Sequence, residues 1–210
     1  MRFLLLLLLA LPLPAAADRG ALTVDAGGGL SAPFVKAPYA PGSSALSASS
    51  PSVWVGGRYA LSNHLEVSAA GFWEPPVTLW HNNVRVRAGG TELPGTLTHQ
   101  ASRAGALVGG RFVYGMVWRL TAGLDVGWSW RRYTGLQAID DTNPAAPVDY
   151  GVQLADVNTH NLVLSPVVGL EWAAGDHWSV AVTPRAQLLL GADPAVAFTV
   201  PVTLSWSWYL

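Results

Sequence analysis

The sequence predicts an all-β protein, an eight-stranded antiparallel transmembrane β-barrel, and three observations indicate this fold. Eight segments alternate apolar residues with small or polar residues at a period of two. Short turns alternate with longer connections between these segments, which is the layout of bacterial membrane barrels. Aromatic residues gather at the segment ends on the apolar parity, whereas ionisable residues occupy the other parity.

The N-terminus has the features of a secretory signal peptide. Arg2 precedes an apolar run at 3–13, and small residues follow at 15–17. A membrane-spanning helix needs about 20 apolar residues, so this run is too short to be one. We expect cleavage after Ala17, which makes residues 1–17 a signal peptide and residues 18–210 a single barrel domain.

The composition narrows the fold class. The chain has no cysteine, which excludes a disulfide framework and a cysteine-linked lipid anchor. Only 12% of residues are charged, well below the roughly 25% of soluble domains. Two classes remain, a soluble β-sandwich or barrel and a membrane barrel that satisfies every backbone group. The net charge of −1 gives no indication of nucleic acid binding.

The alternation places the strands and their connections. The predicted strands are 22–30, 53–61, 65–73, 105–114, 118–130, 162–172, 178–190 and 196–210. Short turns are expected at 62–64, 115–116 and 173–177, and longer connections at 31–51, 75–101 and 132–158, with a brief one at 191–195. Within the second long connection, the alternating segment 84–88 is too short to span and indicates a hairpin extension.

The charged residues of the strands share one parity, and we expect that parity to face the barrel interior. They are Asp25, Arg58, Glu66, Arg111, Arg119, Asp125, Glu171 and Arg185. On a lipid face each arginine near the bilayer midplane would cost roughly 2–4 kcal/mol. Four acids and four arginines can neutralise each other in a lumen. Two interpretations remain: a polar pore or gate, and a structural ion-pair network filling a barrel of eight strands. The second is favoured.

Aromatic residues predict where the membrane interfaces lie. Beside the short turns are Tyr59, Tyr114, Trp118, Trp172, Trp178, Trp206 and Trp208, and beside the long connections are Trp73, Trp128 and Trp130. Trp118 and Trp128 are ten residues apart, which is about 33 Å along a strand. A strand tilt of about 40° reduces this to about 25 Å, the height of the apolar band of a membrane barrel. In a soluble barrel, the large aromatic side chains would instead fill the core and lie near the middle of the strands.

Three prolines interrupt the pattern. Pro166, Pro184 and Pro201 lie inside predicted strands at similar heights. Because proline cannot donate to the backbone ladder, we predict a local bulge or a weakened patch there.

As a pattern over residues 18–210, the chain resembles the small outer-membrane barrel families typified by OmpA, OmpX and OmpW. The last segment, 200–210, looks like the C-terminal signal read by the barrel-assembly machinery, although it ends in Leu210 instead of phenylalanine or tryptophan. The resemblance implies a location in the bacterial outer membrane. It also implies contacts with outer-membrane lipid and lipopolysaccharide, and with the assembly machinery through the last strand.

No catalytic, cofactor or metal site is predicted. The lipid A deacylase family pairs a histidine with a serine two residues on, and this chain has no such pair. The candidates are His99 with Ser102 and His160 with Ser165. The loop acids Asp140, Asp141, Asp149 and Asp156 follow no fixed-spacing calcium motif.

Two function classes therefore remain. The first is an outer-membrane protein with a structural or surface-interaction role and no enzymatic activity. The alternative is a small OmpW-like channel or transporter for small or apolar solutes. Apolar loop walls would support the alternative if the following residues converged: Trp80, Leu93, Leu97, Leu136, Ile139 and Val148.

Overall fold

A computed structural model describes residues 19–143 and 145–209 of the chain. The predicted signal peptide at 1–17 lies outside the described residues. The described residues contain no helix that could cross a bilayer.

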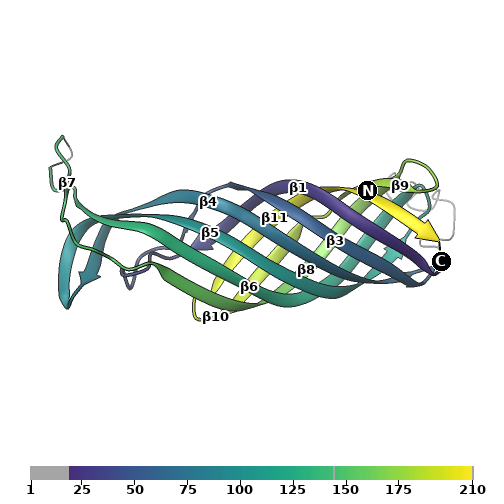
Figure 1. The fold of residues 1–210 in the computed structure, drawn as a ribbon, viewed down its shortest axis with the longest axis horizontal. Helices are drawn as coiled ribbons and strands as arrows, with labels where there is room; N and C mark the ends of the chain where they lie inside the picture. The colour runs from purple at the N-terminus through teal and green to yellow at the C-terminus, as the bar shows by residue number, and fades with distance from the viewer. Residues whose placement is uncertain (1–18, 144, 210) are drawn as a thin grey trace, which may run out of the picture.

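The described chain folds into a closed antiparallel sheet. The strands are β1 (Ala21–Val35), β2 (Leu46–Ser47), β3 (Ser50–Ser62), β4 (Leu65–Ala88), β5 (Thr91–Tyr114), β6 (Trp118–Asp140), β7 (Val148–Asp149), β8 (Val157–Ala173), β9 (Trp178–Val182), β10 (Arg185–Gly191) and β11 (Ala195–Tyr209). β9 and β10 follow one another in a single position between β8 and β11, and β11 pairs with β1 to close the ring. With β2 and β7 as short additions, the ring has eight strand positions, as predicted (Figure 1).

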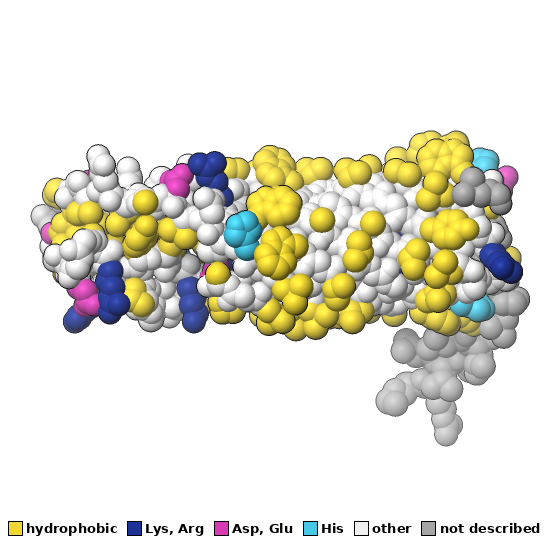
Figure 2. All heavy atoms as spheres, turned by 60° about the horizontal axis from the view of Figure 1, so that its bottom comes forward, with side chains coloured by type: hydrophobic (Ala, Val, Ile, Leu, Met, Phe, Trp, Pro, Cys, Tyr) yellow, Lys and Arg dark blue, Asp and Glu magenta, His cyan; other side chains and the backbone are white. Residues whose placement is uncertain are grey.

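The burial pattern confirms the prediction that charged side chains face the barrel interior and apolar side chains face outward. On β6, Leu124 is 47% exposed while its neighbour Asp125 is 1% exposed. Alternation of this kind is expected when successive side chains point to opposite faces of a sheet. Figure 2 shows apolar side chains over the middle of the barrel, whereas the charged ones on this face lie toward its two ends. The barrel is therefore apolar outside and polar inside.

The predicted long connection at 75–101 is wrong. β4 continues to Ala88 and β5 starts at Thr91, and the two strands stay paired along almost their whole length. The segment 84–88 is indeed part of a hairpin, but that hairpin is continuous with the barrel wall. Pro75 and Pro76 look like strand breakers in the sequence. They sit at a register shift between Glu74 and Val77, where a bulge tolerates proline.

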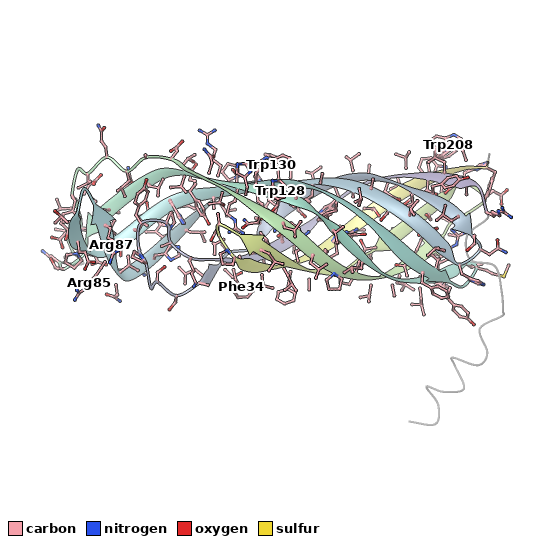
Figure 3. All side chains as sticks on the ribbon, turned by 90° about the horizontal axis from the view of Figure 1, so that it is seen from below. Phe34, Arg85, Arg87, Trp128, Trp130 and Trp208 are labelled. Carbon is pink, nitrogen blue, oxygen red and sulfur yellow. The ribbon has the colours of Figure 1, made fainter. Side chains whose placement is uncertain are left out.

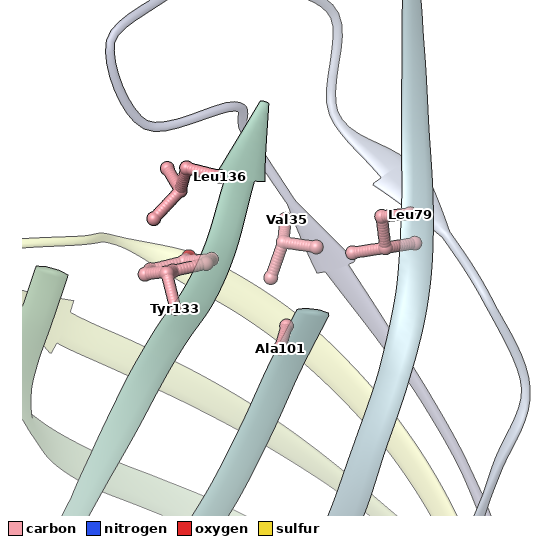
Figure 4. Packing of buried hydrophobic residues seen from close by; sticks show 5 residues of the cluster. All are labelled: Val35, Leu79, Ala101, Tyr133 and Leu136. Carbon is pink, nitrogen blue, oxygen red and sulfur yellow. The ribbon is translucent and has the colours of Figure 1, made fainter. Parts of the chain in front are cut away.

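β4, β5 and β6 form an extension that projects beyond the rest of the barrel, at the end opposite both termini of the described chain (Figure 1). Its inner face is apolar and is covered by residues 36–49. One buried cluster consists of Val35, Leu79, Ala101, Tyr133 and Leu136, contributed by four strands (Figure 4). A second consists of Ala37, Ala40, Val86, Leu97 and Ala138. The extension therefore has a small conventional hydrophobic core above the polar lumen.

The predicted weak patch at the three prolines is confirmed. β9 ends at Val182 and β10 begins at Arg185, with Pro184 in the break. Pairing between β10 and β8 skips the positions opposite Pro166, and pairing of β11 passes from β9 to β10 next to Pro201. The other sides of these strands remain regular, since Pro166 and Pro201 keep their ladder positions against β6 and β1. Around these prolines, the regular ladder is thus interrupted only between β9 and β10, where hydrogen bonds from Val168 N to Pro184 O and from Thr183 N to Pro201 O still bridge the break.

Candidate functional site

The eight predicted interior charges come from seven strands, and the barrel brings them together. Asp25 lies on β1, Arg58 on β3, Glu66 on β4, Arg111 on β5, Arg119 and Asp125 on β6, Glu171 on β8 and Arg185 on β10. On each strand these side chains point inward. Because the sheet closes into a ring, side chains that point inward from different strands meet in the lumen. The charges form two adjoining groups inside the lumen.

Arg58 is the centre of the first group. Its Nη1 donates to Glu171 Oε2 at 2.7 Å and lies 3.4 Å from Glu66 Oε2, and its Nε donates to Asp25 Oδ2 at 3.0 Å. The Arg58 side chain is only 5% exposed. Arg119 Nη1 completes the group, 3.4 Å from Glu171 Oε1. Three carboxylates therefore share one fully engaged guanidinium, with a second at the edge.

Asp125 is the centre of the second group. Its Oδ2 accepts a hydrogen bond from Arg185 Nη1 and lies 3.6 Å from Arg111 Nη2. Ser68 donates to Asp125 Oδ1 at 3.2 Å. The pairing also ties β6 to β10 across the proline interruption, so the charge network strengthens the wall where its ladder is weakest.

A layer of aromatic residues lies above these charges, and sequence reasoning missed it. The rings of Trp54 and Phe72 stack with centroids 5.0 Å apart. The guanidinium of Arg185 lies 4.7 Å from the Trp54 ring centroid, and that of Arg103 lies 4.9 Å from the Phe72 centroid. Leu107 and Val163 pack against this pair. Trp54 and Phe72 alternate in phase with the inward-facing residues of their strands, so the sequence pattern could have placed both rings in the lumen.

A further set of buried ion pairs lies on the loop side of this layer. Arg103 Nε donates to Glu74 Oε2 at 2.9 Å, and Arg131 Nη1 donates to Asp193 Oδ2 at 2.6 Å. These pairs were not predicted because the strands were expected to stop at the aromatic positions. Glu74 follows Glu66 by eight residues on the same strand, so its inward parity could have been read from the sequence.

The lumen is filled by these layers. Between the charged groups lies a cavity of about 30 Å³, lined in part by Asp25, Trp54 and Arg185. Cavities of about 20 and 10 Å³ lie toward the short turns and toward the long connections, respectively. A cavity needs about 10–15 Å³ to hold one water. These three cavities can therefore hold a few waters each at most. A larger, more open pocket of about 320 Å³, lined in part by Tyr39, Tyr133 and Asp193, lies at the loop side.

Two histidines are buried above the lumen, beneath the two hydrophobic clusters of the extension and the segment 36–49, which together we call the apolar cap. The ring centroids of His81 and His99 are 5.1 Å apart, and those of His99 and Tyr133 are 5.2 Å apart. Burial, together with the neighbouring His81, lowers the pKa of His99 to about 4. Burial also lowers the pKa of His81. Both rings are therefore neutral at pH 7.

The histidine–serine arrangements considered from the sequence do not assemble. His160 is exposed and stacks on Trp128 at 6.3 Å, whereas Ser165 is buried in the lumen. His99 is buried, and neither of its ring nitrogens has a hydrogen-bond partner among the described residues. The described residues also contain no group of three or more His, Cys, Asp or Glu side chains placed to hold a metal ion.

The predicted interface aromatics lie on the outer surface near the two ends of the apolar wall. Trp73, Trp128 and Trp130 form the belt next to the extension and are each about half exposed. Trp118 and Trp172 stack at 6.2 Å at the opposite end, and Trp178 meets Trp206 edge-to-face at 4.4 Å. Figure 3 shows Trp128 and Trp130 well separated along the axis from Trp208. The remaining members, Tyr59 and Tyr114, are exposed and half-buried respectively.

The apolar loop residues that would favour a channel do not converge. Leu136 and Leu97 are buried in separate clusters on the inner face of the extension. Trp80 and Ile139 line a hollow on its outer face, and Val148 is 62% exposed. They form no single apolar wall around an entrance.

The closed ring, apolar outside and charged inside, has the architecture of a transmembrane barrel, and solved structures share its fold. Ail of Yersinia pestis, in complex with the heparin analogue sucrose octasulfate, superposes with a TM-score of 0.55 at 10% identity, covering 91% of this chain and all of Ail. Neisserial surface protein A gives 0.52 at 11% identity, covering 90% and 99%. The outer membrane protein OprG of Pseudomonas aeruginosa gives 0.50 at 12% identity, covering 93% and 99%.

The chain thus has the fold of the small eight-stranded outer-membrane β-barrels, as its pattern predicted. No protein-family model matches the sequence, and no curated protein matches it.

Proposed function

We propose that this protein is a non-conducting barrel of the bacterial outer membrane, with a structural and surface-interaction role carried by its extension. The filled lumen is the observation that carries the proposal. Two groups of ion pairs and the Trp54–Phe72 layer fill the middle of the lumen, and the cavities that adjoin them measure about 30, 20 and 10 Å³. A solute path would need these layers to separate.

In this proposal the eight interior charges are structural. Removing one partner of a buried ion pair is strongly destabilising, since it leaves an uncompensated charge. Arg58 touches strands on both sides of the lumen through Asp25, Glu66 and Glu171. The network therefore holds the barrel closed, and no catalytic activity or cofactor is assigned to it.

The membrane placement follows from the outer surface. The two aromatic belts are proposed to lie at the interfaces, where tryptophan and tyrosine are enriched in membrane barrels. Outer-membrane lipid and lipopolysaccharide then surround the wall. The last strand, β11, carries Trp206, Trp208 and Tyr209 near its end, which supports recognition by the barrel-assembly machinery.

The extension is the part available for interaction. It is formed by the longest strands of the barrel, and its tip carries the exposed Arg85 and Arg87 far beyond the belt at Trp128 and Trp130 (Figure 3). Its internal clusters give it a fixed shape. A rigid projecting sheet of this kind suits contacts with surface molecules better than gating.

Single-channel recording tests the proposal. The mature chain is refolded, its folding is checked by the heat-dependent shift of a barrel on a gel, and it is added to a planar bilayer. We expect no discrete current steps. Discrete steps would contradict the proposal and favour the small OmpW-like channel, and changed selectivity in Arg119→Ala and Asp125→Asn would then locate the path.

A further inference from the structure

A hollow of about 720 Å³ lies on the outer face of the extension, away from both the lumen and the apolar cap. Its lining residues are polar apart from three, and they come from β4, β5, β6 and the segment that carries β7. They are Trp80, Asn82, Asn83, Thr96, Gln137, Ile139, Asp141, Pro147 and Asp149. The volume falls within the 300–1,000 Å³ of ordinary small-molecule sites.

Trp80 is the exposed aromatic residue in the lining of this hollow. It lies beyond the aromatic belts, so contact with membrane lipid does not account for its exposure. It follows Trp73 of the outer belt by seven residues, which places it about 23 Å farther along β4. Its side chain is 58% exposed, more than any tryptophan of the two belts. Among the described residues its ring stacks on no other ring. A flat apolar ring is therefore presented to water above the membrane surface.

A bulge places two amide side chains in the lining of the same hollow as this ring. The register of β4 against β5 shifts between His81 and Val84. Asn83 adopts a left-handed conformation with φ of 54°, and both Asn82 and Asn83 are exposed although they are consecutive. In a regular strand one of the two would point to the inner face. Bulges commonly re-aim side chains at functional positions.

Hydrogen bonds fix the floor of the hollow. Thr96 is 5% exposed, and its hydroxyl lies 2.6 Å from Asp141 Oδ2 and 3.1 Å from Asn82 Oδ1. Pairing of Ile139 with Asp149 places β7 along the edge of β6 and brings a second carboxylate to the rim. Three of the polar lining residues, Asn82, Thr96 and Asp141, are therefore held together by hydrogen bonds.

We propose that this hollow binds carbohydrate, one or two residues of a neutral or amino sugar. A pyranose has an apolar C–H face that matches the Trp80 ring, and an ammonium group on the sugar would be attracted to that ring. Its hydroxyls need both donors and acceptors, which amides and carboxylates supply together. The inference rests on the proposed surface-interaction role and names its ligand class.

The charge of the lining selects among sugars. It contains Asp141 and Asp149 and neither lysine nor arginine. Sulfated or phosphorylated sugars would meet uncompensated carboxylates, so they are disfavoured. The same neutral or amino sugar could belong to lipopolysaccharide of the surrounding membrane or to a polysaccharide on another surface.

The test uses the refolded mature chain in lipid nanodiscs and saturation-transfer NMR with defined probes. These are the disaccharides of N-acetylglucosamine and of glucosamine, with sucrose octasulfate as the anionic comparison. We expect transfer to both disaccharides and none to the octasulfate. Trp80→Ala should weaken binding at least tenfold, whereas Trp73→Ala, in the belt and 51% exposed, should leave it unchanged.

The outcomes separate this inference from the proposed function. Absence of disaccharide binding, equal binding by Trp80→Ala, or preference for the octasulfate would each overturn the carbohydrate site. A silent bilayer would still support the non-conducting barrel in every one of those cases. Asn82→Ala, which removes an exposed amide of the lining and its hydrogen bond with Thr96, should also weaken binding, and the heat-dependent gel shift checks that both variants fold. Competition by core oligosaccharide released from lipopolysaccharide, compared with an unrelated polysaccharide, identifies the source of the sugar.

Discussion

Arg58 and Glu171 meet inside the barrel at 2.7 Å, although 113 residues separate them in the chain. β3 and β8 are not neighbours in the ring, so the pair crosses the lumen. Both side chains are at least 95% buried. The contact is therefore a direct tie between opposite parts of the wall, and it explains why the interior is closed.

Arg58→Ala should destabilise the barrel strongly. The substitution leaves Glu171, Glu66 and Asp25 without their shared partner, and breaking a buried pair in this way costs about 3–5 kcal/mol. Equilibrium unfolding in urea from lipid vesicles, followed by tryptophan fluorescence, measures the change. Arg85→Ala is the matched control, since Arg85 is 79% exposed on the extension, and it should change stability by less than about 0.5 kcal/mol. Equal effects of the two substitutions would show that the network is not structural.

Gly105→Ala should destabilise the barrel, whereas Gly71→Ala should not. A Cβ at Gly105 would lie 2.6 Å from the Phe72 ring, while the nearest atom to one at Gly71 is 3.8 Å away. Overpacking of this kind costs about 1–3 kcal/mol. At Gly71 there is room for the methyl group, and alanine reduces the conformational freedom of the unfolded chain. Gly71→Ala should therefore be neutral or slightly stabilising. The same urea experiment measures both, and a neutral Gly105→Ala would mean that the aromatic layer is loosely packed.

Backbone amides beside the proline patch should exchange hydrogen faster than those elsewhere in the wall. The ladder is interrupted at Pro184, and pairing with β8 skips the positions of Ala186 and Gln187, which remain paired with β11. Local opening needs less energy where fewer backbone hydrogen bonds must break. Exchange measured by mass spectrometry should show peptides covering 183–187 losing protection before those covering 122–128 on β6. Uniform protection would contradict the weakened wall.

The apolar cap should loosen as the pH falls. The pKa of His99 is lowered to about 4 by burial and by His81, while an unfolded histidine titrates near 6.5. The cap is therefore fully stable above about pH 6.5, and its stability decreases progressively as the pH falls toward 4. Limited proteolysis of the 36–49 segment between pH 7 and 4 measures this.

The matched variant for that experiment is His99→Leu, which fills the same apolar site without a titrating ring. Its cleavage should depend less on pH over this interval. Identical pH profiles for the wild type and His99→Leu would assign the loosening to other groups.

The parity of the strands made much of this structure predictable. Alternation placed Leu124 outside and Asp125 inside, and it gathered eight charges whose partners it could not specify. Which acid meets Arg58 depends on the ring's tilt and register, since Glu171 comes from a strand that is not a neighbour. Period-two patterns determine the face on which a residue lies but not the height at which it meets another strand.

The extension was missed because local signals conflict with the long-range pairing. Pro75, Pro76 and Pro94 indicate a loop, yet β4 and β5 stay paired. A bulge accommodates Pro75 and Pro76, and Pro94 pairs in register with Arg85. Asn82 and Asn83 likewise indicate a turn, and in the structure they form the bulge beside Trp80. A strand that persists through a bulge is stabilised by its partner and by the packed inner face, which local propensity does not report.

Thiol accessibility tests the central claim most directly, because the chain contains no cysteine. Three single variants are refolded in lipid vesicles and treated with a water-soluble maleimide. Leu124→Cys reports the lipid face, Ser165→Cys the lumen, where Ser165 is 0% exposed, and Val148→Cys the extension, where Val148 is 62% exposed. We predict rapid labelling of the Val148 variant and none of the other two until the barrel is unfolded. Labelling of Ser165→Cys in the folded barrel would show an open, water-filled lumen, and labelling of Leu124→Cys would show that the apolar face does not meet lipid.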